Sequence, residues 1–265
     1  MSTQDSHTFA YLGPVGTFTE AALKTITCDS DITIPFANVT AALDAVRSGQ
    51  ADYALVPIEN SVEGVVARTL DELATGEPLT IAREVTLAVT FALMVKSGTK
   101  EIKRIGTHPH AEIVPTQSTS AAAEAVGKGE IDAAIASGAA AAHYNLEVIA
   151  ENIGDNAGAV TRFIAAQKPG WMPEPTGHDR TSIAVFIDID HAGALLEILQ
   201  VFAQHDVNLT FIQSRPTGRE LGHYHFIIDV EGHINDAPVG KSVEELREIC
   251  DDIRFLGSYP REVRA

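Results

Sequence analysis

The order of apolar segments after residue 180 constrains the fold of this chain more than any other feature. Four stretches have the composition of strands: 181–189, 207–216, 222–232 and 254–260. Two stretches between them have helical spacing: 193–206, and 242–253, which opens with a Ser-x-x-Glu capping box. The order strand, helix, strand, strand, helix, strand is that of a ferredoxin-like βαββαβ unit. We expect one complete module here.

A different pattern precedes this module, and a proline-rich break separates the two. Three prolines and two glycines lie from Lys168 to Gly177, too many for a regular element, so we expect a linker at 168–179. Before the break, strand-like and helix-like stretches alternate, which is typical of an α/β fold with parallel sheets. A length of 265 residues suits two domains.

The charge balance excludes several classes of protein. The chain has 36 acidic and 19 basic residues, which argues against nucleic acid as a partner, because phosphate binding needs a basic face. No apolar run approaches the roughly 18 residues of a membrane helix, and the first residues do not resemble a signal peptide. Cys28 and Cys250 match no metal spacing. We expect a cytoplasmic protein that binds neither nucleic acid nor membrane.

Polar side chains recur where strands of the α/β part give way to helices. Ligands of such folds bind at these carboxyl ends of strands, and helix N-termini favour anions. The same residue types are also the preferred helix caps, so a carboxylate-binding cleft and ordinary capping stay equally open. Thr161 and Arg162 begin a further strand, where a strand former and a strand-end cation are the ordinary interpretation. The junction candidates are Gly16, Thr17, Thr19, Asn60, Ser61, Thr107, Ser118, Thr119 and Ser120.

Two histidine pairs have the spacing of metal ligands on a strand. His108 and His110, and likewise His223 and His225, stand two residues apart and would share a face. No third ligand of matching context accompanies either pair, so we expect no metal. Neither cysteine has a recognisable reactive setting, and a Gly-x-Ser-x-Gly elbow is absent. We also expect no cofactor.

Five motifs in order make the chain similar to a known enzyme family. They read YLGPVGTFTEAAL, ADYALVPIENSVEGVV, THP, STSAAAEAV and TRF. Together they resemble prephenate dehydratase, and the tail, with GALLEILQVFAQHDVNLTFIQSRP and YHFIIDVEGH, resembles the ACT regulatory domain attached to that enzyme. The likeness runs from Phe9 to about Leu256. Because no chorismate mutase segment precedes the first motif, the chain resembles the single-activity form.

The resemblance implies a two-lobed, periplasmic-binding-protein-like dehydratase domain at 8–167 and an ACT domain at 180–258. Lobe 1 would use about 8–80 plus 155–167, and lobe 2 about 81–154, with the active cleft between them. Because ACT effector sites form between paired modules, the resemblance also implies a homodimer or homotetramer.

The implied reaction is the decarboxylating dehydration of prephenate to phenylpyruvate, water and carbon dioxide in phenylalanine biosynthesis, with feedback by phenylalanine. Thr161 would be the catalytic hydroxyl, and Arg162 stays open between orienting the substrate and an ion pair within the fold. The other implied substrate contacts are Thr17, Asn60, Ser61, Thr107, Ser118, Thr119 and Phe163. The implied effector contacts are Gly193, Ala194, Leu195, Asn208, Leu209, Gln213, Ser214 and Arg215. Arogenate dehydration and a non-catalytic amino-acid sensor stay as alternatives.

Two features depart from the family pattern. The family commonly has Glu where this chain has Gln213, which bears on effector affinity. The stretches 103–110 and 112–117 should be parallel neighbours, yet no crossover segment separates them, and parallel strands need about a dozen linking residues or more. We therefore expect that residues are missing from the chain near Ala111–Glu112.

Overall fold

A computed structural model describes residues 6–107, 114–187, 191–216 and 224–262. Its contacts divide the chain into two units. Unit 1 holds Met1–Val66 and Val85–Phe163, and unit 2 holds Ala67–Glu84 and Ile164–Ala265. No helix in the described ranges is long and apolar enough to cross a membrane.

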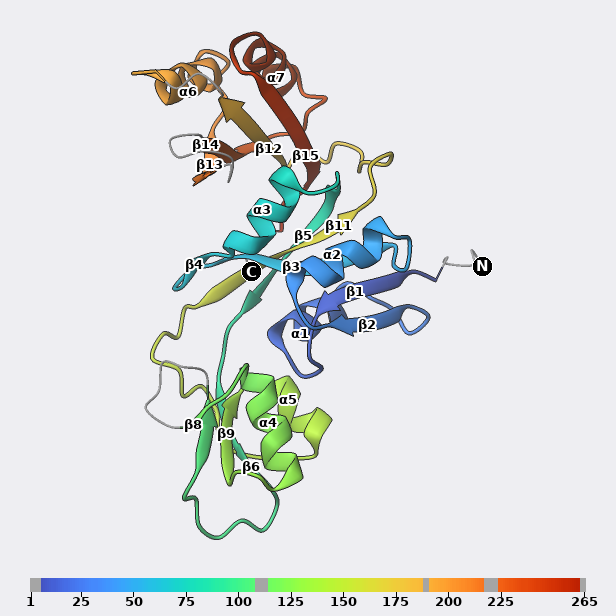
Figure 1. The fold of residues 1–265 in the computed structure, drawn as a ribbon, viewed down its shortest axis with the longest axis vertical. Helices are drawn as coiled ribbons and strands as arrows, with labels where there is room; N and C mark the ends of the chain where they lie inside the picture. Colours follow the sequence, from blue (N-terminus) through green and yellow to red (C-terminus); the bar gives the residue numbers. More distant parts are fainter. Residues whose placement is uncertain (1–5, 108–113, 188–190, 217–223, 263–265) are drawn as a thin grey trace. The chain divides into compact units, whose positions relative to one another are not determined.

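The first sheet of unit 1 has the parallel pairing that the strand–helix alternation predicts. Strand β1 (Thr8–Leu12) pairs in parallel with β2 (Ile32–Phe36) and with β3 (Tyr53–Asn60), while the short β4 (Gly64–Val65) returns antiparallel to β3. Helices α1 (Phe18–Lys24) and α2 (Val39–Arg47) link these strands and bury their apolar faces (Figure 1). The sheet order is β2-β1-β3-β11-β5, where β5 (Thr80–Ala88) and β11 (Val160–Gln167) run from one unit into the other.

The second sheet of unit 1 is mixed, so the prediction of parallel sheets was wrong for part of it. Its order is β10-β6-β9-β7-β8, with β7 parallel to β8 and β9, and β6 antiparallel to β9 and β10. The strands are β6 (Ala92–Val95), β7 (Ile105–Thr107), β8 (Val114–Pro115), β9 (Ala133–Ala136) and β10 (Glu147–Ala150). The chain reaches β6 from β5 without a crossover helix, so the rule for parallel βαβ units does not fix its direction.

Two helices pack against this second sheet and form a hydrophobic core with it. Helix α4 (Thr119–Lys128) and helix α5 (Gly138–Tyr144) bury small residues, among them Ala122 and Ala140, in one core cluster with Ala134 of β9. The predicted parallel pairing of β7 and β8 is confirmed. The junction Ala111–Glu112 lies outside the described residues, so the expected loss of a crossover segment there stays a prediction.

Unit 2 contains the predicted ferredoxin-like module. The element order β12 (Asp179–Ile187), α6 (Ala194–Gln204), β13 (Leu209–Pro216), β14 (Tyr224–Glu231), α7 (Ala237–Ile249) and β15 (Asp252–Pro260) is βαββαβ. The four strands form an antiparallel sheet in the order β13-β14-β12-β15. Both helices pack on one face of it, around Val185, Phe202 and Leu246 (Figure 1).

The predicted start and end of the last helix were wrong. Helix α7 begins at Ala237 after the N-cap Asp236, and Pro238 stands in its first turn, where the missing N–H of proline costs no hydrogen bond. Ser242 is therefore inside the helix, where its hydroxyl donates to the Pro238 carbonyl at 2.8 Å. The Ser-x-x-Glu sequence is not a capping box here, and 252–253 belong to β15.

The sheet face opposite α6 and α7 carries polar side chains that contact the other segment of unit 2. Arg215 on β13 donates to both carboxylate oxygens of Asp71, at 2.9 and 2.8 Å, and Asp71 lies on α3 (Ala67–Thr75). Arg254 on β15 donates to the Gly76 carbonyl at 2.6 Å, just beyond the end of α3. Two cations from opposite edges of the sheet thus bind one helix.

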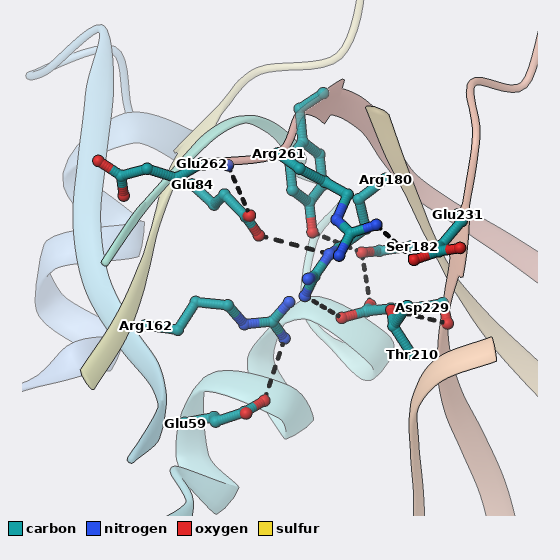
Figure 2. Close-up of polar contacts among 11 residues, drawn as sticks. Glu59, Glu84, Arg162, Arg180, Ser182, Thr210, Asp229, Glu231, Arg261 and Glu262 are labelled. Carbon is teal, nitrogen blue, oxygen red and sulfur yellow. Dashed lines mark hydrogen bonds and ion pairs between the residues drawn. The ribbon is translucent and has the colours of Figure 1, made fainter. Parts of the chain in front are cut away.

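A third arginine lies in the middle of that face. Arg180 on β12 stands 3.4 Å from the Glu84 carboxylate and 3.3 Å from that of Asp229, as Figure 2 shows. Ser182 donates to Asp229 at 2.6 Å and lies 2.7 Å from the Tyr259 hydroxyl. Glu84 and Asp229 are almost fully buried, so both charges depend on this pairing.

His225 lies buried on this face without a hydrogen-bond partner among the described residues. The side chain is fully buried, stacks on Phe186 with ring centroids 5.1 Å apart, and neither ring nitrogen has a hydrogen-bond partner among the described residues. Burial lowers the pKa of His225 below its usual 6.5; the Asp71 carboxylate opposes this shift, and the cations of Arg215 and Arg254 add to it. The ring is therefore neutral in the folded protein near pH 7.

This depressed pKa predicts a loss of stability in acid. Because the unfolded chain binds the His225 proton first, the free energy of unfolding should fall as the pH drops from about 7.5 through 6.5, by about 1.4 kcal/mol for each unit of pKa difference. In His225→Phe that part of the pH dependence should vanish. Urea unfolding at pH 8 and pH 5.5 measures it, with the exposed His143→Phe as control. Equal pH dependence in wild type and His225→Phe would contradict this account.

Candidate active site

Two strands bring Asn60 and Thr161 together, although they lie 101 positions apart in sequence. Asn60 ends β3 and Thr161 is the second residue of the neighbouring β11. The Asn60 side-chain amide donates to Thr161 Oγ1 at 2.8 Å. Thr161 is only 8% exposed, so this hydrogen bond is largely shielded from water.

The turn after β3 fixes which way the Asn60 amide faces. Its oxygen Oδ1 accepts the backbone N–H groups of Val62 at 2.8 Å and Glu63 at 3.0 Å. Flipping the amide would lose both bonds, so its NH₂ group has to point to Thr161. Thr161 Oγ1 therefore acts as an acceptor toward Asn60, and within the described ranges its own O–H donates to no protein group. The site presents an oriented hydroxyl donor.

The neighbouring residues tie β11 to the end of β3. Ser61 donates its backbone N–H to the Val160 carbonyl at 2.9 Å, and its hydroxyl accepts the Val160 N–H at 2.9 Å. Both polar groups of Ser61 thus hold the start of β11. These two hydrogen bonds between Ser61 and Val160 keep Thr161 in register with Asn60.

Arg162 pairs with an acidic residue of the adjacent strand. Its Nη2 lies 3.4 Å from Glu59 Oε2, and its side chain is 6% exposed (Figure 2). Sequence reasoning left Arg162 open between a substrate contact and an ion pair, and the structure shows the ion pair. The next residue, Phe163, is 1% exposed and lies in the core.

A second group of predicted residues lines a cavity of about 800 Å³ in unit 1. Thr17 is the N-cap of α1, where Oγ1 accepts the Glu20 N–H at 3.3 Å, and Ser118 is the N-cap of α4, where Oγ accepts the Ala121 N–H at 3.1 Å. Both capping residues face this cavity. Helix N-termini carry partial positive charge, so this arrangement suits a carboxylate.

The predicted substrate residues therefore fall into two groups. Thr17 and Ser118 line the cavity, whereas Asn60 and Thr161 do not. Two further predicted residues are also outside its lining: Thr119, the first residue of α4, and Thr107, the last residue of β7. Sequence reasoning missed Tyr144 and His143, which also line the cavity, and took their helix for plain packing. The signal available was Ser137, a polar residue directly before that helix.

The predicted effector residues also fall into two groups. Gly193, Ala194 and Leu195 line a pocket of about 190 Å³ beside Tyr224 and Phe226 in unit 2. Gly193 has a φ of +104°, which favours glycine, and begins α6 as its N-cap. The other predicted contacts do not line this pocket: Asn208, Leu209, Gln213, Ser214 and Arg215. Gln213 donates to the Ser214 carbonyl at 3.0 Å, and Asn208 helps to lower the pKa of the Glu231 carboxyl.

The described residues hold no metal-binding cluster, and the Cys250 thiol is unreactive near neutral pH. Among the described residues no three His, Cys, Asp or Glu side chains are grouped to hold a metal ion; His108, His110 and His223 lie outside them. Burial raises the pKa of the Cys250 thiol to about 11, so it stays protonated near neutral pH and is a poor nucleophile.

Comparison with known families decides the identity. A model of the prephenate dehydratase family matches residues 9–170, which is more than half of the chain, and a model of the ACT domain matches residues 181–248. The chain belongs to the prephenate dehydratase family. The prephenate dehydratase of Amycolatopsis methanolica is 43% identical over 268 residues, covering 95% of this chain and 88% of the relative.

Solved structures agree with the family and confirm the predicted fold class. The prephenate dehydratase from Arthrobacter aurescens, in complex with L-Phe, is 47% identical with a TM-score of 0.89, covering 96% of this chain and 90% of that one. A protein described as GqqA, a novel type of quorum quenching acylase, is 27% identical with a TM-score of 0.85, covering 96% and 98%. The family's dehydratase domain followed by an ACT domain is the architecture of this chain.

Proposed function

We propose that this member of the prephenate dehydratase family converts prephenate to phenylpyruvate, water and carbon dioxide, with Thr161 as the hydrogen-bond donor to the departing hydroxyl. The observation that carries this role is the Asn60 amide, which occupies an acceptor position of Thr161 Oγ1 and leaves its O–H to be donated. The setting is buried, so a donated hydrogen bond there is stronger than in water.

Beyond this hydrogen bond, the reaction requires few catalytic groups. The ring carboxylate leaves as carbon dioxide, its bonding electrons form the new ring double bond, and the ring hydroxyl leaves, so one proton converts that hydroxyl to water. Aromatisation makes the step downhill, and no electron acceptor is needed. Hydroxide is a poor leaving group, which makes a proton or strong hydrogen bond at that oxygen the main requirement. An alkyl hydroxyl is a weak acid, so Thr161 donates a hydrogen bond or relays a proton.

The remaining substrate contacts follow from charge. The side-chain carboxylate of prephenate would lie at the N-termini of α1 and α4, next to Thr17, Ser118 and Thr119, where helix dipoles and free N–H groups favour an anion. Asn60 orients Thr161, and Ser61 holds its strand. Contacts of Thr107, Arg162 and Phe163 with substrate stay predictions.

Regulation is proposed for the pocket at the start of α6. Gly193, Ala194 and Leu195 form a small, largely apolar recess, and the related Arthrobacter aurescens enzyme is described in complex with L-Phe. Phenylalanine, bound there and by five residues between paired ACT modules, would regulate the enzyme; the five are Asn208, Leu209, Gln213, Ser214 and Arg215. This requires a homodimer or homotetramer. The enzyme would act in the cytoplasm.

Replacement of Thr161 tests the reaction and the role together. Thr161→Val removes the hydroxyl at nearly equal volume and should lower kcat for phenylpyruvate formation by about 10²- to 10³-fold, whereas Thr161→Ser should stay within about tenfold of wild type. Calorimetry should show that prephenate still binds to Thr161→Val. Thr181→Val, which removes another buried strand hydroxyl, is the matched control.

Near-normal turnover by Thr161→Val would refute the role of Thr161. Lack of prephenate turnover by the wild type would refute the proposed reaction. Arogenate and an N-acyl amide are assayed in parallel, and turnover of either would reveal a different substrate.

The effector pocket gives a separate test. Phenylalanine should inhibit the wild type, and Leu195→Ala, which removes apolar contact area from the pocket, should raise the half-inhibitory concentration at least about fivefold. Ile249→Ala, a similarly exposed position on α7 outside this pocket, should not change it. Equal inhibition of both variants would place the effector elsewhere.

A further inference from the structure

The turn Gly13–Thr17 is held by side-chain hydroxyls that come from the helices of the other sheet of unit 1. Ser137 Oγ donates to the Gly16 carbonyl at 2.7 Å, and Tyr144 donates to the Val15 carbonyl at 3.2 Å. Ser120 Oγ donates to the same Val15 carbonyl. Two consecutive carbonyls of one turn thus accept hydrogen bonds from three side chains more than 100 residues away.

Neither Ser120 nor Ser137 uses its hydroxyl to cap the helix in which it lies or which it precedes. Ser137 is the N-cap of α5, yet its side chain makes no capping hydrogen bond, and the residue is 3% exposed. Ser120 lies inside α4, where Ser118 already is the N-cap, and it is fully buried. A buried hydroxyl that does not serve its own helix has to be satisfied elsewhere, and both are satisfied by the turn.

Gly16 shows how closely the turn approaches these helices. Its φ is +82°, and a Cβ atom there would lie 2.9 Å from Ser120 Oγ and 3.1 Å from the Ala140 Cα. A side chain at this position would be strained and would also push the turn away from α4 and α5. On the other side of the turn, Glu20 accepts the Gly16 N–H at 2.5 Å. The turn is therefore fixed from both sides.

We propose that Ser120, Ser137 and Tyr144 form a latch that positions Thr17 and Ser118 relative to each other across the cavity, an inference that rests on the proposed function. Thr17 directly follows the latched Gly16, and Ser118 precedes the latching Ser120 by two residues. The latch thereby sets the spacing of the two helix N-termini across the cavity, where the prephenate carboxylate binds. Ser120 and Ser137 are positioning residues, since they do not line the cavity and act on the substrate through Thr17 and Ser118, whereas Tyr144 also lines the cavity itself.

The latch predicts a specific kinetic signature. Loss of two buried hydrogen bonds should shift the balance between latched and open protein about 5- to 100-fold toward the open form. Because substrate binds only to the latched arrangement, the apparent KM rises as the latched fraction falls. Substrate already bound in the latched form reacts at the normal rate, so kcat stays within about threefold of wild type.

The double variant Ser120→Ala/Ser137→Ala tests this signature. We expect KM for prephenate to rise, by at most about 100-fold, with kcat nearly unchanged, because KM scales with the inverse of the latched fraction. Ser242→Ala is the matched control, since Ser242 is also fully buried and donates to a carbonyl, but within its own helix. The control should leave KM unchanged. Gly16→Ala, which pushes the turn away without removing a hydroxyl, should raise KM in the same way.

Hydrogen exchange gives a readout that needs no substrate. In the double variant the amides of residues 13–20 should exchange at least about fivefold faster, while those of β3 should keep their wild-type rates. Faster exchange with unchanged KM would show a structural contact only and overturn the positioning role. Unchanged exchange would overturn the latch itself. If the wild type did not convert prephenate, the proposed function would fail while hydrogen exchange still decided the latch.

Discussion

The return of the chain beside β3 is the constraint on which the active site depends. Residues of one site lie 101 positions apart, and only the strand pairing of β3 with β11 brings Asn60 to Thr161. The turn after β3 holds the amide by its oxygen, and Ser61 holds the start of β11. Backbone contacts of Asn60 and of Ser61 therefore fix the hydrogen bond from the Asn60 amide to Thr161 Oγ1, and this leaves the Thr161 hydroxyl available to donate to substrate.

Scarce positive charge shapes the rest of the molecule. The chain has 19 basic residues, and four of its arginines are engaged inside the fold: Arg162 with Glu59, Arg180 with Glu84 and Asp229, Arg215 with Asp71, and Arg254 with Gly76. Among the described residues, no Lys or Arg lines the cavity at Thr17 and Ser118, so a carboxylate there would meet neutral donors and helix N-termini. These interact with a carboxylate through fixed dipoles, so their alignment matters more than net charge.

Local sequence predicted those elements whose signals are local. Apolar periodicity and turn residues located the βαββαβ module, and the capping residues Thr17 and Ser118 begin helices as expected. The start of α7 was missed because Ser242 and Glu245 imitate a cap, while Pro238 tolerates an earlier start. The prediction of parallel sheets failed at β6 because an alternation of strands and helices does not reveal the direction of each strand.

The site was harder to predict than the fold, because its contacts are long-range. Motifs pointed to Thr161, but no local feature shows that Asn60 orients it or that Glu59 pairs with Arg162. Ser137 resembles an ordinary helix cap in sequence, and only the folded chain shows its hydroxyl on Gly16. Register between distant strands decides such pairs, and one sequence does not contain it.

A double-mutant cycle between Asn60 and Thr161 tests the central claim most directly, because it asks whether the amide acts through the hydroxyl. Asn60→Ala alone should lower kcat for phenylpyruvate formation by about tenfold, because the hydroxyl loses its orientation. In a Thr161→Val background the same substitution should change kcat by less than about twofold. If the two losses instead multiply, so that the double variant is about tenfold slower than Thr161→Val, Asn60 acts independently and the account of an oriented hydroxyl donor is wrong.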